Sequence, residues 1–461
     1  MKSGFSAYAV MLTVLLSACV PPFEDPQPES PAGSGVEAHL PGEYSDFKPV
    51  DLDDSQVIDG YTDRVAYSPG DSIRLYINAR QDLPNATLSL YDIVYNRIGQ
   101  VRGHISIQRM ASGKPYQHGF GYRLPLRFRL PTNLRSGMYL LGGLIPFLVR
   151  ADPKTSPNRA VVIYPSNTEA AYNEEGGKSM YSSDRARTVS FLRPRWVRWF
   201  QKPFLIWAWR NNLPVDFICD ADMDDYRSIE RYKVIIPIGH SEYWTLKARQ
   251  NFDRFIDAGG HGLVLSGNTM WWRVTYSADG RQMHCSRDWH VDNWDNPKLG
   301  YLVGRSLGAS FTLGGYGFAR DGHPNPKGGQ GFIITEPASP LLAGTGLKKG
   351  DLLSVPTDEY DGVPLHFPAG SSFPVWNDNA FNFAQRRLIG FDHAVDVNDN
   401  RGKPVHGTFI VFRRTPTSGY VVNTATTDWC SAKGIGGKDG DKIQRITRNA
   451  LDLLLADRSP L

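Results

Sequence analysis

The chain has few cysteines and little net charge, and each shortage excludes a class of protein. It holds 4 Cys among 461 residues, which is too few for a small fold held together by disulfide bonds. Its 51 basic and 47 acidic residues leave a formal net charge of +4 without a long basic run, so nothing indicates nucleic-acid binding. With 41% hydrophobic residues, the composition is that of an ordinary globular protein and not of a disordered chain.

Motifs that would identify a thiol nucleophile or a nucleotide site are also missing. No Gly-x-Cys-x-Gly sequence occurs, so a cysteine at a sharp strand-to-helix turn has no support. The glycine fingerprint of dinucleotide-binding folds and the P-loop are absent as well. A catalytic site in this chain is therefore expected to work without a thiol nucleophile and without those phosphate-binding loops.

The N-terminus has the pattern of an export signal. Lys2 precedes a short apolar run, Ala7 to Leu16, which is too short to span a membrane as a stable helix. The run ends in Leu-Ser-Ala-Cys at Cys19, which resembles the bacterial lipoprotein signal. We expect residues 1–18 to be a signal peptide and Cys19 to be lipidated; an ordinary secretory signal is the alternative. The protein would then be anchored in the cell envelope, on its periplasmic or extracellular face.

Composition divides the rest of the chain. Residues 19–54 are rich in proline and lack apolar periodicity, which predicts a disordered tether. Residues 55–155 form an expected β domain and residues 156–461 an expected α/β domain. Outside the cytoplasm one pair of the remaining cysteines could oxidise, and the sequence leaves the pairing open among Cys219, Cys285 and Cys430.

The β domain is predicted from alternation of apolar and polar residues. Ser72 to Ile77 alternates with period two after a turn at Ser68 to Asp71, and Leu124 to Leu130 alternates again. About seven short strands in about 90 residues suggest an immunoglobulin-like β-sandwich.

The α/β domain is predicted from strands that alternate with helices. Helical patterns cover Pro203 to Asn211, Leu246 to Ala258 and Asp441 to Leu455. This order predicts a parallel, doubly wound sheet of the flavodoxin-like or glutamine-amidotransferase-like kind. The first four expected strands are Val161 to Tyr164, Val215 to Cys219, Val234 to Ile238 and Leu263 to Leu265.

Polar side chains follow each of these strands. Ligands of open parallel sheets bind beyond the carboxyl ends of the strands. Helix capping explains Asp220, Asp222 and Ser266 well, because short polar residues commonly cap helices. Capping does not explain His240 and Glu242, which lie two residues apart and would face one pocket from an extended segment. A His-x-Glu pair without a nucleophile indicates metal-activated water or ligand binding.

An ordered set of motifs resembles the large-subunit family of N,N-dimethylformamidase. The clearest pieces are Gly239 to Trp244 and Ser266 to Trp272. Further pieces in consistent order are Gly60 to Arg64, Ser68 to Asp71, Ser136 to Tyr139, Ala171 to Asn173, Thr426 to Trp429 and Ile446 to Asn449.

The resemblance implies a mononuclear ferric ion held by two tyrosines and a glutamate. The glutamate falls on Glu242, one tyrosine on Tyr172 and the other on Tyr139. His240 and Asn268 match positions that face the substrate or support the metal ligands. A further acidic residue falls on Glu359, with Asp392 as a rival, and a basic residue falls on Arg287.

Such a site is chemically coherent. Ferric iron is a hard cation that prefers anionic oxygen ligands. Open coordination positions would let the metal polarise an amide carbonyl and activate water, while His240 shuttles a proton and Asn268 stabilises the oxyanion. The sequence therefore predicts an iron-dependent hydrolase of C–N bonds in a small amide.

The alternative is a non-catalytic envelope lipoprotein that binds a glycan or another small ligand in a crevice between the two domains. The chain is shorter than the dimethylformamidase large subunit, and it leaves open whether a small partner subunit or a homo-oligomer is needed.

Overall fold

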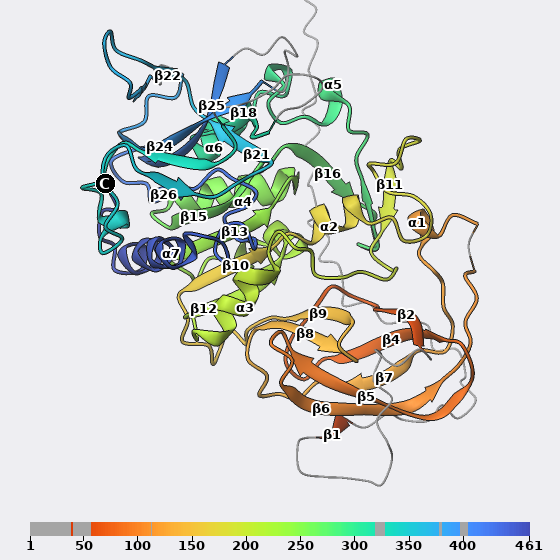
Figure 1. Ribbon diagram of the computed structural model, residues 1–461. Coiled ribbons are helices and arrows are strands. Elements are labelled where there is room, and N and C mark those ends of the chain that lie inside the picture. The colour runs from red at the N-terminus through yellow and green to blue at the C-terminus, as the bar shows by residue number, and fades with distance from the viewer. Residues whose placement is uncertain (1–37, 40–56, 112, 319–327, 378–379, 397–403) are drawn as a thin grey trace, which may run out of the picture. The chain divides into compact units, whose positions relative to one another are not determined.

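The computed structural model describes residues 38–39, 57–111, 113–318, 328–377, 380–396 and 404–461 (Figure 1). The chain divides into two compact units, Met1–Gly35 and Val36–Leu461, and all described residues belong to the second unit. The expected signal peptide, Cys19 and most of the expected tether lie outside the described residues. Among the residues that are described, no helix has the length and apolarity needed to cross a membrane.

Two β-sheets form the N-terminal part. The first has the order β1-β6-β5-β8-β9-β3, with β1 at Ala38–His39, β6 at Arg97–Ile105, β5 at Leu83–Asp92, β8 at Gly137–Leu141, β9 at Ile145–Val149 and β3 at Ala66–Tyr67. The second has the order β2-β4-β7, with β2 at Val57–Thr62, β4 at Ser72–Ala79 and β7 at Leu126–Arg129. Strand β1 falls inside the range expected to be a tether and pairs with β6.

These two sheets share one hydrophobic core, as expected of a sandwich. In β4, Ile73, Leu75 and Ile77 are buried while the residues between them are more exposed, which is the alternation read from the sequence. They pack in the same cluster as Leu88 and Leu90 of β5. The alternating pattern therefore located a β-rich region correctly.

A mixed sheet of eleven strands forms the rest of the core. Its parallel part has the order β12-β10-β13-β15-β26, with β12 at Val215–Cys219, β10 at Ala160–Tyr164, β13 at Val234–His240, β15 at His261–Gly267 and β26 at Tyr420–Asn423. Numbered along the chain this is 2-1-3-4-5, the flavodoxin-like order. The expected parallel strands are present, but they form one part of a larger mixed sheet.

Helices cover both faces of the parallel strands, so the sheet is doubly wound (Figure 1). Val162 of β10 packs in one core cluster with α3 (Lys202–Arg210) and α7 (Gly440–Leu455). Its neighbour Val161 packs in the other cluster with α4 (Leu246–Asp257) and α6 (Val303–Leu307). Because both faces of each strand are buried, the strands read as continuous apolar runs.

The segment after Asn268, which lacks a clear sequence pattern, extends the sheet with antiparallel strands. Beyond β26 the order is β25 (Pro404–Arg413), β24 (Gln385–Val395), β18 (Ser310–Tyr316) and β21 (Glu359–Gly362). Strand β19 (Gly331–Ile334) pairs with β24 and with β20 (Leu352–Ser354). This extension brings Glu359 to the sheet edge from far along the chain.

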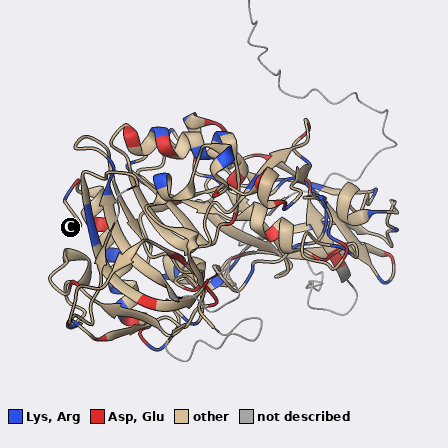
Figure 2. Cartoon of the chain, turned by 90° about the horizontal axis from the view of Figure 1, so that it is seen from above, with Lys and Arg blue, Asp and Glu red and all other residues tan. Residues whose placement is uncertain are grey.

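Smaller elements complete the described structure. A four-stranded sheet consists of β11 (Thr188–Ser190), β17 (Gln282–His284), β16 (Trp272–Tyr276) and β14 (Tyr243–Thr245), and β22 (Leu365–His366) pairs with β23 (Val375–Trp376). The short helices are α1 (Pro115–His118), α2 (Ser166–Tyr172) and α5 (Trp289–Asp292), with 3-10 turns at Asp220–Asp224, Tyr226–Ser228, Pro297–Leu299 and Pro340–Leu342. Basic and acidic residues are interspersed along these elements, as the near-balanced composition implies (Figure 2).

Tyr139 belongs to the core of the β-rich part. Its ring stacks on Phe147, with ring centroids 5.9 Å apart, and meets Trp209 of α3 edge-on. Its hydroxyl donates a 2.6 Å hydrogen bond to the backbone carbonyl of Arg135. The hydroxyl of Tyr139 therefore makes its hydrogen bond within the β-rich part of the chain.

We expect Tyr139→Phe to lower the free energy of unfolding by about 0.5–1.5 kcal/mol, because the partly buried hydrogen bond to the Arg135 carbonyl is lost. Urea denaturation of the wild type and the variant measures the difference. Equal stability of the two proteins would mean that this hydrogen bond contributes nothing.

Candidate functional site

A cluster of polar side chains lies at the carboxyl ends of β13 and β15. His240 is the last residue of β13, and Glu242 follows two residues later. Gly267 ends β15, and Asn268 comes next. Tyr172 ends helix α2, which follows β10, the neighbour of β13 in the sheet. The strand-end residues therefore converge at one edge of the parallel sheet.

His240 is the centre of this cluster. Its Nε2 lies 3.3 Å from Oε2 of Glu242 and 3.1 Å from the hydroxyl of Tyr172. Its Nδ1 lies 3.2 Å from the backbone carbonyl of Gly267, which fixes the ring orientation. The side chains of His240 and Glu242 are each only 3% exposed.

A second tyrosine, Tyr181, joins the cluster from the loop after α2. Its hydroxyl lies 2.7 Å and 2.9 Å from the two carboxylate oxygens of Glu242. Its ring stacks on that of Tyr172, with centroids 3.8 Å apart. Tyr243 donates a 2.9 Å hydrogen bond to the Tyr181 hydroxyl. One phenol oxygen and one carboxylate therefore contact the imidazole of His240, and a second phenol contacts that carboxylate from another side.

Asn268 and Glu359 close the other side of the cluster. The side-chain amide of Asn268 donates a 3.1 Å hydrogen bond to Oε2 of Glu359, which also lies 3.6 Å from Nε2 of His240. Asn268 has a φ of 47°, a left-handed conformation that asparagine tolerates better than most residues. The buried Oδ1 of Asn268 has no hydrogen-bond donor among the described residues.

Burial and mutual attraction set the charges of the cluster. Burial favours the neutral form of Glu242, but the hydrogen bond and charge of His240 outweigh it and lower the pKa of Glu242. Burial likewise disfavours the imidazolium, but Glu242 and Glu359 together raise the pKa of His240 to about 9. Burial, reinforced by the Glu242 charge, raises the pKa of both Tyr172 and Tyr181 well above the usual phenol range.

The donor set suits a hard cation with more than one positive charge. Across the described residues, no group of three or more His, Cys, Asp and Glu side chains could hold a metal ion. Tyr172, Tyr181 and Glu242 supply three oxygens in one place. Phenolate and carboxylate are ligands that ferric iron prefers. The residues present therefore fit the metal that the sequence resemblance implies.

The cluster opens into a cavity of about 610 Å³. This volume is typical of sites for organic molecules of moderate size. Its lining combines the cluster with aromatic and charged side chains: Tyr172, Tyr181, Arg185, Phe200, His240, Glu242, Asn268, Trp271, Trp272, Arg287, Phe311, Tyr316, Asp358, Glu359 and Thr427.

The structure brings together most of the site residues expected from the sequence, but Tyr139 is not among them. Tyr172, His240, Glu242, Asn268 and Glu359 all line the cavity. Tyr139 does not, because its hydroxyl is bonded inside the sandwich core.

The tyrosine next to Glu242 is Tyr181, which the sequence did not single out. It lies in an irregular segment whose residues show no period, so only its short distance along the chain from Tyr172 could have suggested it.

The structure distinguishes the two candidates for the further acidic site residue, Glu359 and Asp392. Asp392 accepts a 2.7 Å hydrogen bond from the Tyr360 hydroxyl and bonds to the backbone of Gln330 and Gly331, so it is used inside the sheet extension. Glu359 is the acidic residue that faces the cavity. Arg287 also lines the cavity, with its guanidinium carbon 3.7 Å from the ring centroid of Tyr181.

A serine with an elbow-like sequence is structural. Ser306 lies in Gly304-Arg305-Ser306-Leu307-Gly308, but this segment is the short helix α6 and not a strand-to-helix turn. Its buried hydroxyl accepts a hydrogen bond from Arg249 and donates one to Asp253. This serine is therefore no candidate nucleophile.

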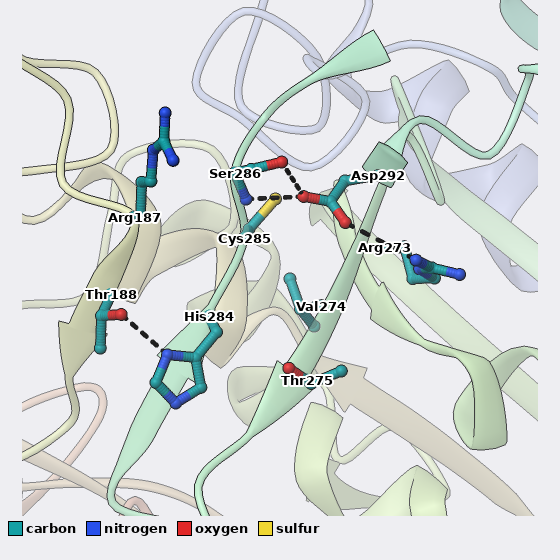
Figure 3. Close-up of a pocket in the computed structure, with 9 residues that line it drawn as sticks. All are labelled: Arg187, Thr188, Arg273, Val274, Thr275, His284, Cys285, Ser286 and Asp292. Carbon is teal, nitrogen blue, oxygen red and sulfur yellow. Dashed lines mark hydrogen bonds and ion pairs between the residues drawn. The ribbon is translucent and has the colours of Figure 1, made fainter. Parts of the chain in front are cut away.

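A second cavity of about 300 Å³ lies on the small sheet formed by β11, β16 and β17 (Figure 3). Its carboxylate, Asp292, accepts hydrogen bonds from Ser286 and lies 3.9 Å from Arg273. Burial raises the pKa of the Cys285 thiol well above its usual value, so the thiol stays protonated and weakly nucleophilic. The groups for hydrolysis meet only in the larger of these two cavities.

The three cysteines of the described residues are all free and buried. None of Cys219, Cys285 and Cys430 is paired with another, and the possible disulfide left open by the sequence does not form among them.

One of the comparisons with known proteins identifies a family for this chain. The family model described as "N,N-dimethylformamidase beta subunit-like, C-terminal" matches residues 116–438. No curated protein sequence matches the chain. Among solved structures, a ThuA-like protein from Bacteroides uniformis is 13% identical over 67% of this chain and 98% of that chain, with a TM-score of 0.33. A β-galactosidase from Bacillus circulans sp. alkalophilus is 9% identical over 62% of this chain and 31% of that chain, with a TM-score of 0.29.

We expect Gly267→Ala to displace His240 and to destabilise the protein by several kcal/mol. A Cβ at this position would meet the backbone of Thr427 and lie 2.5 Å from the carbonyl carbon of Thr426, and neither can move without shifting a strand end. Gly113→Ala is the matched control, because a Cβ there meets nothing within 4 Å. Thermal unfolding of the two variants measures the contrast, and equal melting temperatures would contradict it.

Proposed function

This chain belongs to the N,N-dimethylformamidase beta subunit-like, C-terminal family, and from that premise we propose that it is an iron-dependent hydrolase of amide C–N bonds. One observation carries the proposal. The oxygens of Tyr172, Tyr181 and Glu242 lie in one cluster, in which Tyr172 and Glu242 contact His240 and Tyr181 contacts Glu242, and this cluster lines a cavity large enough for a substrate.

Tyr172, Tyr181 and Glu242 are the proposed iron ligands. When bound, a ferric ion would polarise the amide carbonyl and lower the pKa of a water molecule in an open coordination position. The protein contributes a buried site in which two phenols and a carboxylate are already in contact. This arrangement favours a bound cation. Burial raises the pKa of both phenols, and a cation beside them would stabilise their ionised form.

His240 is proposed to carry the proton. Its Nε2 lies within 3.6 Å of both Glu242 and Glu359, and its Nδ1 is held by the Gly267 carbonyl. Hydrolysis removes a proton from water and delivers one to the leaving nitrogen. A group that transfers this proton is helped by hydrogen-bond acceptors on both sides that hold its ring in place. Glu359, with a side chain 18% exposed, is the acceptor nearest to the open part of the cavity.

Asn268 is proposed to orient the substrate. Its side chain is fixed at one end by the hydrogen bond to Glu359. A fixed amide dipole beside the reacting carbonyl stabilises developing charge without reorganisation.

The N-terminal motif supports a location for this activity. We propose that Cys19 is acylated and tethers the domain to a membrane at the periplasmic or extracellular face. The substrate would then be a small amide met outside the cytoplasm. A non-catalytic envelope protein that binds its ligand in the same cavity is the outcome expected if no amide is hydrolysed.

We expect Tyr181→Phe and Glu242→Gln to lose bound iron and to lower kcat/KM for amide hydrolysis at least about hundredfold. Elemental analysis and the visible phenolate-to-iron absorption band measure the metal directly. Tyr139→Phe is the matched control, since the Tyr139 hydroxyl is bonded to Arg135 outside the cavity, and it should keep both iron and absorption.

If folded wild-type protein binds no iron when it is incubated with an excess of ferric salt, the metal assignment is overturned. Retained activity in Glu242→Gln would remove Glu242 from the mechanism.

We expect Cys19→Ser to abolish incorporation of labelled fatty acid and to move the protein from the membrane fraction to the soluble fraction of a bacterial host. The reason is that the thiol is the only attachment point for the acyl chains in the lipoprotein signal. Unchanged membrane association in the variant would point to an ordinary secretory signal or to a different anchor.

A further inference from the structure

We propose that the substrate is an amide that carries a six-membered ring, one face of which packs on an aromatic wall beside the reactive cluster. The inference rests on the proposed function, because it names the substrate class of the same cavity. Four features of the described residues carry it: volume, wall composition, register and the aromatic path to the surface.

The cavity is much larger than the smallest amides need. At about 30 Å³ per molecule of liquid water, 610 Å³ corresponds to roughly 20 water molecules. Dimethylformamide would fill a small fraction of this space and leave water next to the reacting carbonyl. A substrate with a ring would displace that water and strengthen the electrostatic contacts of the site.

One wall of the cavity is continuous aromatic surface. Trp271 meets Phe311 edge-on, with centroids 5.2 Å apart, and Phe311 meets Tyr316 edge-on at 5.3 Å. Trp271 also contacts Trp272 at 5.9 Å. All four rings line the cavity. Flat rings of a ligand gain most of their affinity from such surfaces.

The register of the sheet extension puts this wall next to the reactive carboxylate. Tyr316 of β18 is paired directly with Glu359 of β21. Side chains of directly opposite residues lie on the same face of a sheet, roughly 5 Å apart at Cβ. A ring seated on Tyr316 would therefore hold its amide close to Glu359 and His240.

An aromatic path also leads from the cluster towards solvent. Phe200 lies 5.3 Å from the ring of His240 and stacks on Trp199 at 3.8 Å. Trp199 is 44% exposed, and the ammonium of Lys433 lies 5.3 Å from its ring. Lys433 also lies 3.3 Å from Asp358, which lines the cavity. Charged groups that can bind polar substituents of a ring therefore lie at the solvent end of this aromatic path.

The ring could belong to an aromatic amine or to an amino sugar, because both present a flat face to aromatic side chains. In either case the reaction is the same hydrolysis. The C–N bond breaks, the water oxygen bonds to the acyl carbon, and the water proton passes to the nitrogen of the leaving amine.

The test compares amides with and without a ring on the iron-loaded wild-type protein. Acetanilide and N-acetylglucosamine are the two ring substrates, and N-methylacetamide and dimethylformamide are the acyclic ones. We expect kcat/KM for at least one ring amide to exceed that of the acyclic amides at least about tenfold. Whichever ring amide is preferred identifies the source of the ring.

Two variants connect the preference to the wall. Tyr316→Ala should reduce the ratio of ring to acyclic kcat/KM about tenfold, mainly through KM. Trp199→Ala removes an exposed side chain, so it tests the aromatic path from Phe200 to solvent with little risk to the fold. Trp196→Ala is the matched control: it removes a tryptophan of similar exposure, 49%, that, unlike Trp199, has no ring contact with Phe200 among the described residues, and it should leave the ratio within about twofold.

Calorimetric titration of the same amides separates this inference from the hydrolase proposal. Ring amides that bind more tightly than acyclic amides, and lose that advantage in Tyr316→Ala, support the ring site even if no amide is cleaved. Hydrolysis of acyclic amides at equal or greater kcat/KM would overturn the ring site and leave the hydrolase proposal intact. Absence of both cleavage and binding would overturn the ring site and the hydrolase proposal together.

Discussion

The buried carboxylate of Glu242 is the constraint on which this site depends. A carboxylate removed from water costs several kcal/mol unless charge and hydrogen bonds replace its hydration. Here the replacement comes from His240 and Tyr181, which approach it from different segments of the chain. His240 is in turn held by Tyr172 and the Gly267 carbonyl. Moving any one of these groups leaves a charge or a donor stranded in the interior, so the cluster forms as a unit.

The topology explains why these residues can meet. The parallel strands β12 and β13 lie on opposite sides of β10, so the direction in which successive strands are added to the sheet reverses at β10. Helix α2 leaves β10 at this point, and the His-x-Glu segment leaves β13. That reversal opens a crevice at the carboxyl ends of the strands, the usual ligand site of such sheets. The antiparallel extension then carries Glu359 to the same edge through β21, next to Asn268. A general property of parallel sheets thus supplies the place, and an irregular insertion supplies the last carboxylate.

The sequence predicted the parts of this arrangement that depend on local pattern. Continuous apolar runs such as Ala160–Tyr164 identified strands buried on both faces, and the two-residue spacing of His240 and Glu242 identified side chains that share a pocket. It failed where tertiary contacts decide the outcome. Tyr139 and Tyr181 are chemically identical and follow no period, and only the fold shows that one hydroxyl is bonded to Arg135 and the other to Glu242. The strands between Asn268 and Pro404 were missed because their pairing partners lie far apart along the chain, as β18 and β21 do.

The charge balance of the cluster favours a trivalent cation over the commoner divalent metals. Zinc sites are usually built from cysteine and histidine, whereas the oxygens gathered here come from two phenols and one carboxylate. Burial holds both phenols in the neutral form, so a cation has to provide enough attraction to ionise them. Three anionic oxygens then neutralise a charge of three, and the buried interior is left without net charge. A divalent ion with the same ligands would leave one negative charge uncompensated beside side chains that are almost fully buried. The ferric iron that we propose therefore suits the burial of these ligands as well as their hardness.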